Sequence, residues 1–145
     1  MSTSPSIDAD RSARDEHRVG QHTVVIQGDL AFVDFIGDES PEEAREIGDL
    51  LVGYLVARPR FYVICDVRRI GNVPSETRKT WIRWFKTHSP NAIVLIGAGI
   101  GIHTLVKLII AATRVLTGKE PRFVLVGSED EARAWVERHR QQNKA

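Results

Sequence analysis

Features that would settle a function class are scarce in this sequence of 145 residues. Its single cysteine, Cys65, excludes an internal disulfide and a multi-cysteine zinc site. The five histidines are not spaced as metal ligands are. A formal net charge of +1 means that the chain as a whole has no excess charge to attract nucleic acid. We therefore expect neither a metal nor a cofactor, and no nucleic-acid partner.

An uninterrupted apolar run long enough to span a membrane is also missing. Residues 93–116 are rich in apolar side chains, but glycines at positions 97, 99 and 101 interrupt them. His103, Lys107 and Arg114 then recur along one helical face. A charge at the centre of a bilayer costs at least about 2.5 kcal/mol. The pattern predicts a buried strand followed by a packed helix.

The first residues contain no apolar segment of the kind found in secretory signals. Residues 1–20 are small, polar and mixed in charge, which predicts a disordered tail. Residues 21–145 then form one domain, because their number suits a single domain of ordinary size. Together with the absence of a disulfide framework, these features favour a cytoplasmic protein.

Apolar periodicity and capping signals predict an α/β domain with a mixed five-stranded sheet covered by helices, in the order β-β-α-β-α-β-α-β-α. Two β-rich segments separated by residues 28 and 29 indicate an antiparallel hairpin. Ser40 and Glu43 have the spacing of a capping box, and a second box begins at Ser128. The expected strands are 23–27, 30–36, 61–66, 92–96 and 122–126, and the expected helices are 40–57, 75–88, 102–116 and one from 128 onward.

The end of the strand at 61–66 is the first candidate site. Asp66 closes an apolar run, and Arg68 and Arg69 follow it in a short turn. Ser75 then opens the next helix, with Arg78 about one turn further on. In open α/β sheets, ligands bind beyond the carboxyl ends of the strands. Guanidinium groups at such an edge can hold a phosphate or carboxylate bidentately. We predict a ligand or partner site formed by these five residues.

Each of these side chains also has a structural interpretation. Ser75 is either a phosphate acceptor at a helix N-terminus or a helix cap worth about 1 kcal/mol. Arg78 either binds an anion, pairs with Asp66 or extends to solvent. The two arginines of the turn are either part of an anion site or simply solvated. Asp34, a lone acid in the second strand, has no partner base and is poor evidence for acid–base catalysis.

The helix at 102–116 is apolar over much of its circumference. The residues expected to face the sheet are Leu105, Leu108, Ile109, Ala112 and Leu116. An apolar and basic interaction face is predicted from His103, Val106, Lys107, Ile110 and Arg114. Such a face suits a lipid pocket, a homodimer or contact with a membrane, and the alternative is a fully buried helix.

No catalytic or cofactor motif is complete. The glycine turn at 97–101 does not have the spacing of a dinucleotide fingerprint, so its glycines are expected to serve a tight turn and close packing. Cys65 lies inside an apolar strand and is expected to be a core residue. Because no nucleophile–base pair can be assembled, we expect a protein that is not an enzyme.

Three strings in the second half of the chain carry a resemblance: NAIVLIG, LTGKEPRFVLV and SEDEARAWV. Together with the element order, they are similar to the SpoIIAA-like family of the STAS superfamily, over residues 21–140. That superfamily includes anti-sigma-factor antagonists, which are phosphorylated on a serine at the start of the helix after the third strand. Ser75 lies at the matching distance, but Pro74 replaces the usual aspartate and Glu76-Thr77 the usual serine-glycine. The family also resembles the CRAL-TRIO lipid-binding fold, which implies an apolar ligand.

Two functional hypotheses arise from these observations. The first is a non-enzymatic, regulatory STAS-like module that binds a partner protein or a small apolar or anionic ligand at the edge of Asp66, Ser75 and Arg78. The second is a carrier of an apolar ligand or lipid, or a membrane-associating module, that uses the helix at 102–116.

Overall fold

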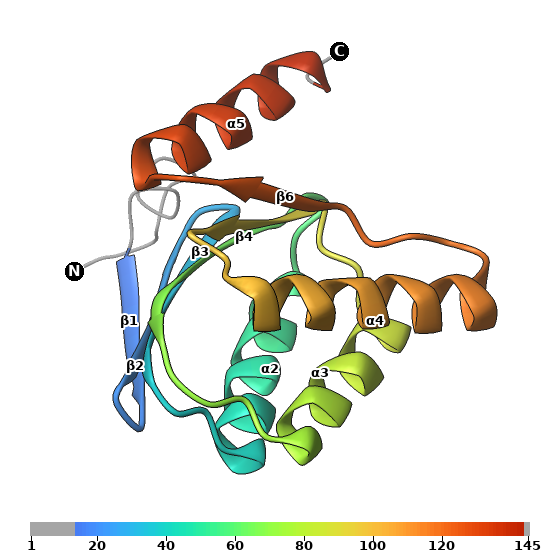
Figure 1. The fold of residues 1–145 in the computed structure, drawn as a ribbon. Coiled ribbons are helices and arrows are strands. Elements are labelled where there is room, and N and C mark those ends of the chain that lie inside the picture. The colour runs from blue at the N-terminus through green and yellow to red at the C-terminus, as the bar shows by residue number, and fades with distance from the viewer. Residues whose placement is uncertain (1–13, 144–145) are drawn as a thin grey trace.

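The computed structural model describes residues 14–143, which form one six-stranded sheet with helices on both of its faces (Figure 1). The strands are β1 (Arg14–Val19), β2 (His22–Gln27), β3 (Leu30–Gly37), β4 (Tyr62–Ile70), β5 (Ala92–Ile96) and β6 (Phe123–Val126). The helices are α2 (Pro41–Leu55), α3 (Ser75–Thr87), α4 (Ile100–Thr117) and α5 (Glu129–Gln142). The predicted α/β class is confirmed.

The strands lie in the sheet in the same order as in the chain. β1, β2 and β3 pair antiparallel, whereas β3, β4, β5 and β6 pair parallel. The three parallel connections step in one direction and contain α2, α3 and α4. Because such crossovers have one preferred hand, their helices lie on the same face of the sheet. α5 follows the last strand and covers the other face (Figure 1).

The sheet has six strands and not the predicted five, because residues 14–19 form β1 and are not part of a tail. The strand has the sequence RDEHRV, in which Val19 is the only buried residue. It pairs with β2 over all six residues. A charged edge strand of this kind has no alternating apolar signal, since neither of its faces is buried over most of its length. The rest of the predicted tail, residues 1–13, lies outside the described residues.

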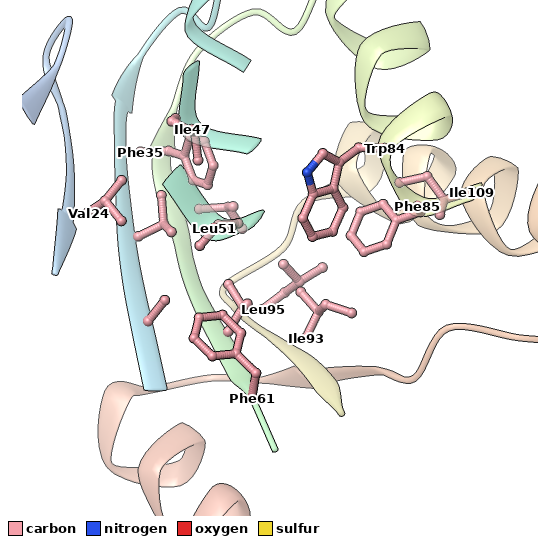
Figure 2. Close-up of a cluster of buried hydrophobic side chains, with 14 of the residues drawn as sticks. Val24, Phe35, Ile47, Leu51, Phe61, Trp84, Phe85, Ile93, Leu95 and Ile109 are labelled. Carbon is pink, nitrogen blue, oxygen red and sulfur yellow. The ribbon is translucent and has the colours of Figure 1, made fainter. Parts of the chain in front are cut away.

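The larger core lies between the sheet and helices α2, α3 and α4. Figure 2 shows Phe35 of the sheet beside Ile47 of α2, and Leu95 beside Ile93 of β5, with Trp84 and Phe85 of α3 on the other side of the cluster. A second, smaller core lies under α5 and uses the alternate residues of the same strands, as the period of two in a strand requires. Its buried members are Tyr62, Ile64, Ala92, Val94, Ile96, Ala132 and Val136.

Both predicted capping signals mark real helix starts. Ser40 Oγ accepts a hydrogen bond from the Glu43 N–H at 3.1 Å, and Glu43 Oε1 accepts one from the Ser40 N–H at 3.0 Å, so the first capping box is complete. At α5, Ser128 Oγ accepts from the Glu131 N–H at 3.2 Å. Glu131 Oε1 instead accepts from the Gly127 N–H at 3.0 Å, one residue before the expected donor.

α4 is the one helix among residues 14–143 that is long and apolar enough to cross a membrane by length and composition, and 22% of it is buried. Its predicted orientation is partly wrong. Leu105 and Ile109 are buried as expected, but Leu108 and Leu116 are 46% and 60% exposed. Val106, expected on the outer face, is buried instead. Apolar residues occupy much of the circumference of this helix, so the sequence pattern does not define a single side that faces the core.

Candidate functional site

A groove of about 750 Å³ lies at the carboxyl ends of β4 and β5. One side consists of residues between 67 and 78, from the end of β4 and the start of α3. The other side consists of residues between 97 and 105, from the glycine turn and the start of α4. Arg68 and Arg78 line it together, so the structure brings two of the five predicted edge residues into one concave site.

Arg68 neutralises the buried carboxylate of Asp66. Its Nε and Nη2 donate to the two carboxylate oxygens at 3.0 and 2.7 Å, and its backbone N–H donates to Oδ1 at 3.1 Å. The hydrogen bonds from Arg68 lower the pKa of Asp66, although burial opposes the shift. Asp66 is therefore an ionised anchor that orients Arg68 at the groove, and it is poorly suited to accept a proton.

Arg69 lies outside this groove. Its Nη2 donates to Asp34 Oδ2 at 2.8 Å, and Asp34 is the register partner of Asp66 in the neighbouring strand. The two adjacent acids are thus each neutralised by a separate arginine. Asp34 lies two residues after Phe32 in β3 and therefore on the same face of the sheet. Phe32 packs against the core under α5. Asp34, for which the sequence indicated no partner, is thus paired with Arg69 in the structure.

Arg78 does not form the ion pair with Asp66 that was one interpretation of its spacing. Its Nη1 donates to the Val73 carbonyl oxygen at 2.7 Å, within the loop that precedes α3. Asp66 is already occupied by Arg68, which is only two residues away. A guanidinium has five N–H donors. Among residues 14–143 the Arg78 side chain makes this one hydrogen bond, which leaves it further donors for a ligand in the groove.

Ser75 is not a helix cap. Pro74 occupies the N-cap position of α3, with no side-chain hydrogen bond to the helix, and Ser75 is the first helical residue. Its side chain is exposed. Ser75 does not line the groove, but the preceding Pro74 does.

The three glycines at the start of α4, two before the helix and Gly101 within its first turn, serve different needs. Gly97 has φ +70°, and a Cβ there would come within 2.3 Å of Arg68 Cγ, so the side chain of Arg68 packs against bare backbone. A Cβ at Gly99 or Gly101 would meet nothing within 4 Å. The prediction of close packing is therefore confirmed for Gly97 and wrong for the other two. Both open positions border the groove, where they leave the backbone of the first turn of α4 accessible.

Behind the groove, an apolar cavity of about 80 Å³ lies between the sheet and helices α2, α3 and α4. Five side chains line both the cavity and the groove. The shared residues are Val67, Ile70, Val73, Ile102 and Leu105. The cavity is thus separated from the surface groove by a single layer of side chains.

Glu39, which the sequence did not single out, is the polar residue of this cavity. It is 2% exposed, and its Oε2 accepts a hydrogen bond from Trp81 Nε1 at 2.9 Å. Burial raises the pKa of Glu39 to about 7, and the nearby charge of Glu43 adds to the shift while the hydrogen bond from Trp81 opposes it. In the sequence, Glu39 looks like an ordinary polar residue before a helix cap, and only the folding of α3 over it makes it buried.

Cys65 also lines the cavity, from the middle of β4. Burial raises the pKa of its thiol, so the reactive thiolate is strongly disfavoured. No group of three or more potential metal ligands occurs within residues 14–143. The chemistry of this region is thus one of hydrogen bonding, ionic contact and apolar burial.

The predicted interaction face of α4 is divided by the fold. Val106 lines the cavity, and Ile110 is partly buried against the larger core. His103, Lys107 and Arg114 are exposed, and Arg114 pairs with Glu120. The basic half of the predicted face is thus on the surface, and the apolar half faces inward.

No family model matches this chain, and no curated protein does. Among solved structures, it is similar to an uncharacterised protein of the DUF3478 family with a SpoIIAA-like fold, from Shewanella loihica PV-4. The sequences are 13% identical, the TM-score is 0.52, and the similarity covers 85% of this chain and 91% of that one. The fold is therefore SpoIIAA-like, as the sequence resemblance predicted, and at this identity the likeness extends to the fold alone.

Proposed function

We propose that this protein is a non-enzymatic binding module of the STAS type, and that its ligand is a small amphipathic anion. The observation that carries the proposal is the layer of five shared side chains between the groove and the cavity. A charged head placed in the groove would have its apolar part directed at that layer. Ligand sites commonly combine an apolar enclosure with a few polar anchoring groups in this way.

The charged end of the ligand is assigned to the groove because Arg68 and Arg78 both line it. Arg68 is held in place by Asp66, so its position costs little further ordering when a ligand binds. Arg78 is half-buried and is anchored to the loop by one hydrogen bond. A carboxylate or phosphate can accept charge-assisted hydrogen bonds from both side chains.

The apolar end is assigned to the cavity. Its volume of about 80 Å³ is small compared with the several hundred Å³ of a typical drug-sized pocket. A short alkyl chain or a single ring suits this space better than a long acyl chain does. Movement of Ile102 and Leu105 at the start of α4 would join the two spaces, since these residues border both.

A chemical step is not part of the proposal. Asp66 is engaged by Arg68, and the thiol of Cys65 is held in its neutral form. Ligand binding is the activity that these residues support.

The proposal is tested by calorimetric titration with octanoate, with octanol and acetate as matched probes. Octanoate should bind more tightly than either, because only octanoate has both a charge and an apolar chain. Arg78→Gln should weaken octanoate binding by about tenfold, the value of one charge-assisted hydrogen bond, and change octanol binding little. Arg83→Gln, an exposed arginine of α3 outside the groove, is the control. Equal affinity for octanoate and acetate would contradict the proposal.

A partner protein is the second candidate occupant of the same edge, and the exposed hydroxyl of Ser75 favours it. A phosphate there would place negative charge at the N-terminus of α3, beside Pro74 of the groove. In the same titrations, Ser75→Asp should weaken octanoate binding through repulsion, and Ser75→Ala should not. Unchanged binding in both variants would remove Ser75 from the site.

A further inference from the structure

The outer face of α4 exposes a stripe of large apolar side chains. Among residues 14–143, six large apolar side chains are exposed, and four of them belong to this helix. Ile100, Leu108 and Val115 are 87%, 46% and 83% exposed. Leu108 and Val115 are seven residues apart, which is about two helical turns, so they lie along one line, and Ile100 lies roughly 60–80° around the helix from that line on the same outer half. Leu116 extends the apolar surface at the C-terminal end.

This exposure is unusual for a helix of such composition. α4 is as apolar as a core helix, yet only 22% of it is buried. Its buried residues, which include Leu105 and Ile109, already supply its contact with the core. Figure 1 shows that the C-terminal turns of α4 extend beyond α3, so no other described element covers them. Packing of the fold therefore does not account for the outer stripe.

A basic strip runs beside the apolar stripe. His103, Lys107 and Arg114 are spaced by four and seven residues, which places them along a second line on the same helix. All three are exposed. α4 contains no aspartate or glutamate, and the acid that pairs with Arg114 is Glu120 in the following loop. The outer surface of α4 thus presents apolar and positively charged side chains side by side, with no acidic residue of the helix among them.

We propose that this face of α4 docks on the surface of an anionic lipid bilayer. The helix would lie in the interface, with the stripe of Ile100, Leu108 and Val115 among the acyl chains and the basic strip at the phosphates. Amphipathic interfacial helices have this combination of an apolar side and flanking lysine or arginine. The helix lies on the membrane and does not span it, because Leu105 and Ile109 hold its inner side in the core.

Charge complementarity decides between a bilayer and a second copy of the chain. An anionic bilayer offers both an apolar layer and negative charge to the two lines of α4. A second α4 would offer an apolar stripe, but its charges would all be positive. The start of α4 also borders the groove, so docking would bring the mouth of the groove to the membrane surface. The docking inference nevertheless depends on α4 alone, and vesicle binding is measured without octanoate.

The test is co-sedimentation of the full chain with vesicles of phosphatidylglycerol, compared with vesicles of phosphatidylcholine. The protein should bind the anionic vesicles, bind the neutral ones at least about tenfold more weakly, and be released by high salt. Val115→Asp should reduce binding by about tenfold or more, because it places a charge in the inserted stripe. Val56→Asp is the matched control, since Val56 is 79% exposed on another helix end.

Charge is tested separately. Lys107→Glu should reduce binding to phosphatidylglycerol by about tenfold, whereas Lys79→Glu on α3 should have little effect. Sedimentation velocity is run in parallel on the same proteins. Equal binding to both vesicle types would overturn the inference, as would a dimer that Val115→Asp dissociates without any vesicle binding. Absence of vesicle binding by a monomeric wild-type chain would overturn it as well.

Discussion

Glu39 combines a carboxyl group, nearly complete burial and an apolar neighbourhood, which together disfavour its ionised form. In the unfolded chain such a carboxyl ionises near its ordinary pKa of 4.5, and in the folded protein its pKa is about 7. Between these values the folded state holds a proton that the unfolded state has lost. Stability therefore falls as the pH rises through this window and stays at the lower level above it.

Glu39→Gln should remove this dependence and retain an acceptor for Trp81. We expect the variant to be more stable than the wild type at pH 8, by up to roughly 3 kcal/mol, and to differ little at pH 5. Urea unfolding at the two pH values measures the difference. Glu46→Gln, an exposed residue of α2, is the control and should follow the wild-type pH dependence. A parallel pH dependence of Glu39→Gln and wild type would contradict the shifted pKa.

At the same scale, the sequence placed Asp66 at the strand edge but did not indicate its partner. Arg78 was a candidate, because it interrupts the apolar face of its helix and could reach over the strand edge toward Asp66. The structure shows a register irregularity between β3 and β4 after Asp34. The irregular backbone there, which continues as a strand to Ile70, lets Arg68 fold back on Asp66. A bulge of this kind depends on the neighbouring strand and has no local signature.

α4 shows which properties of a helix the apolar periodicity of its sequence can predict. Its existence and approximate limits were predicted, because eighteen residues without proline and with a glycine after the end form a clear helix pattern. Its orientation was predicted only in part, since a helix that is apolar over much of its circumference has no unique buried side. Contact with α3 and the cavity sets the orientation, and it buries Val106 in place of Leu108.

The orientation of α4 makes a quantitative prediction for two leucines three residues apart. Leu105→Ala should lower the free energy of unfolding by about 2–3 kcal/mol, because Leu105 is buried in the larger core. Leu108→Ala should lower it by less than about 1 kcal/mol, since Leu108 is 46% exposed. Urea unfolding of both variants measures the two effects. Equal losses would mean that the helix is rotated relative to this structure.

At the scale of the whole molecule, the two cores share their strands. β4 directs Val63 toward the larger core and Ile64 toward the core under α5, and β5 alternates in the same way. If the helices on one face detach and the strands separate, the apolar residues on the other face of the same strands also become exposed. The molecule should therefore unfold as one cooperative unit, as small single domains usually do.

Val136→Ala tests this coupling. Val136 is 1% exposed in the smaller core, and its truncation should lower the free energy of unfolding by roughly 1–2 kcal/mol. Urea transitions followed by tryptophan fluorescence and by far-ultraviolet circular dichroism should coincide in the wild type and in the variant. Both should shift to lower urea by the same amount. Separate transitions would show that α5 and its core unfold independently of the rest.

What the sequence by itself determined is the succession of elements after β1 and the first and last residues of most helices, to within a few positions. Period-two and period-3.6 apolar patterns, together with the serines that begin α2 and α5, are local properties and were enough for that. They also located the edge that contains Asp66, Arg68 and Arg78, because parallel strands end on the same side of a sheet.

Only the tertiary structure decided which side chains meet. The burial of Glu39, the separation of Arg69 from Arg68, the cavity behind the groove and the exposed stripe of α4 all depend on residues distant in the chain. Such contacts are set by packing between elements, which no single segment encodes. Edge strand β1 belongs with them, since β2 supplies its partners and the charged segment contains no alternating apolar pattern of its own.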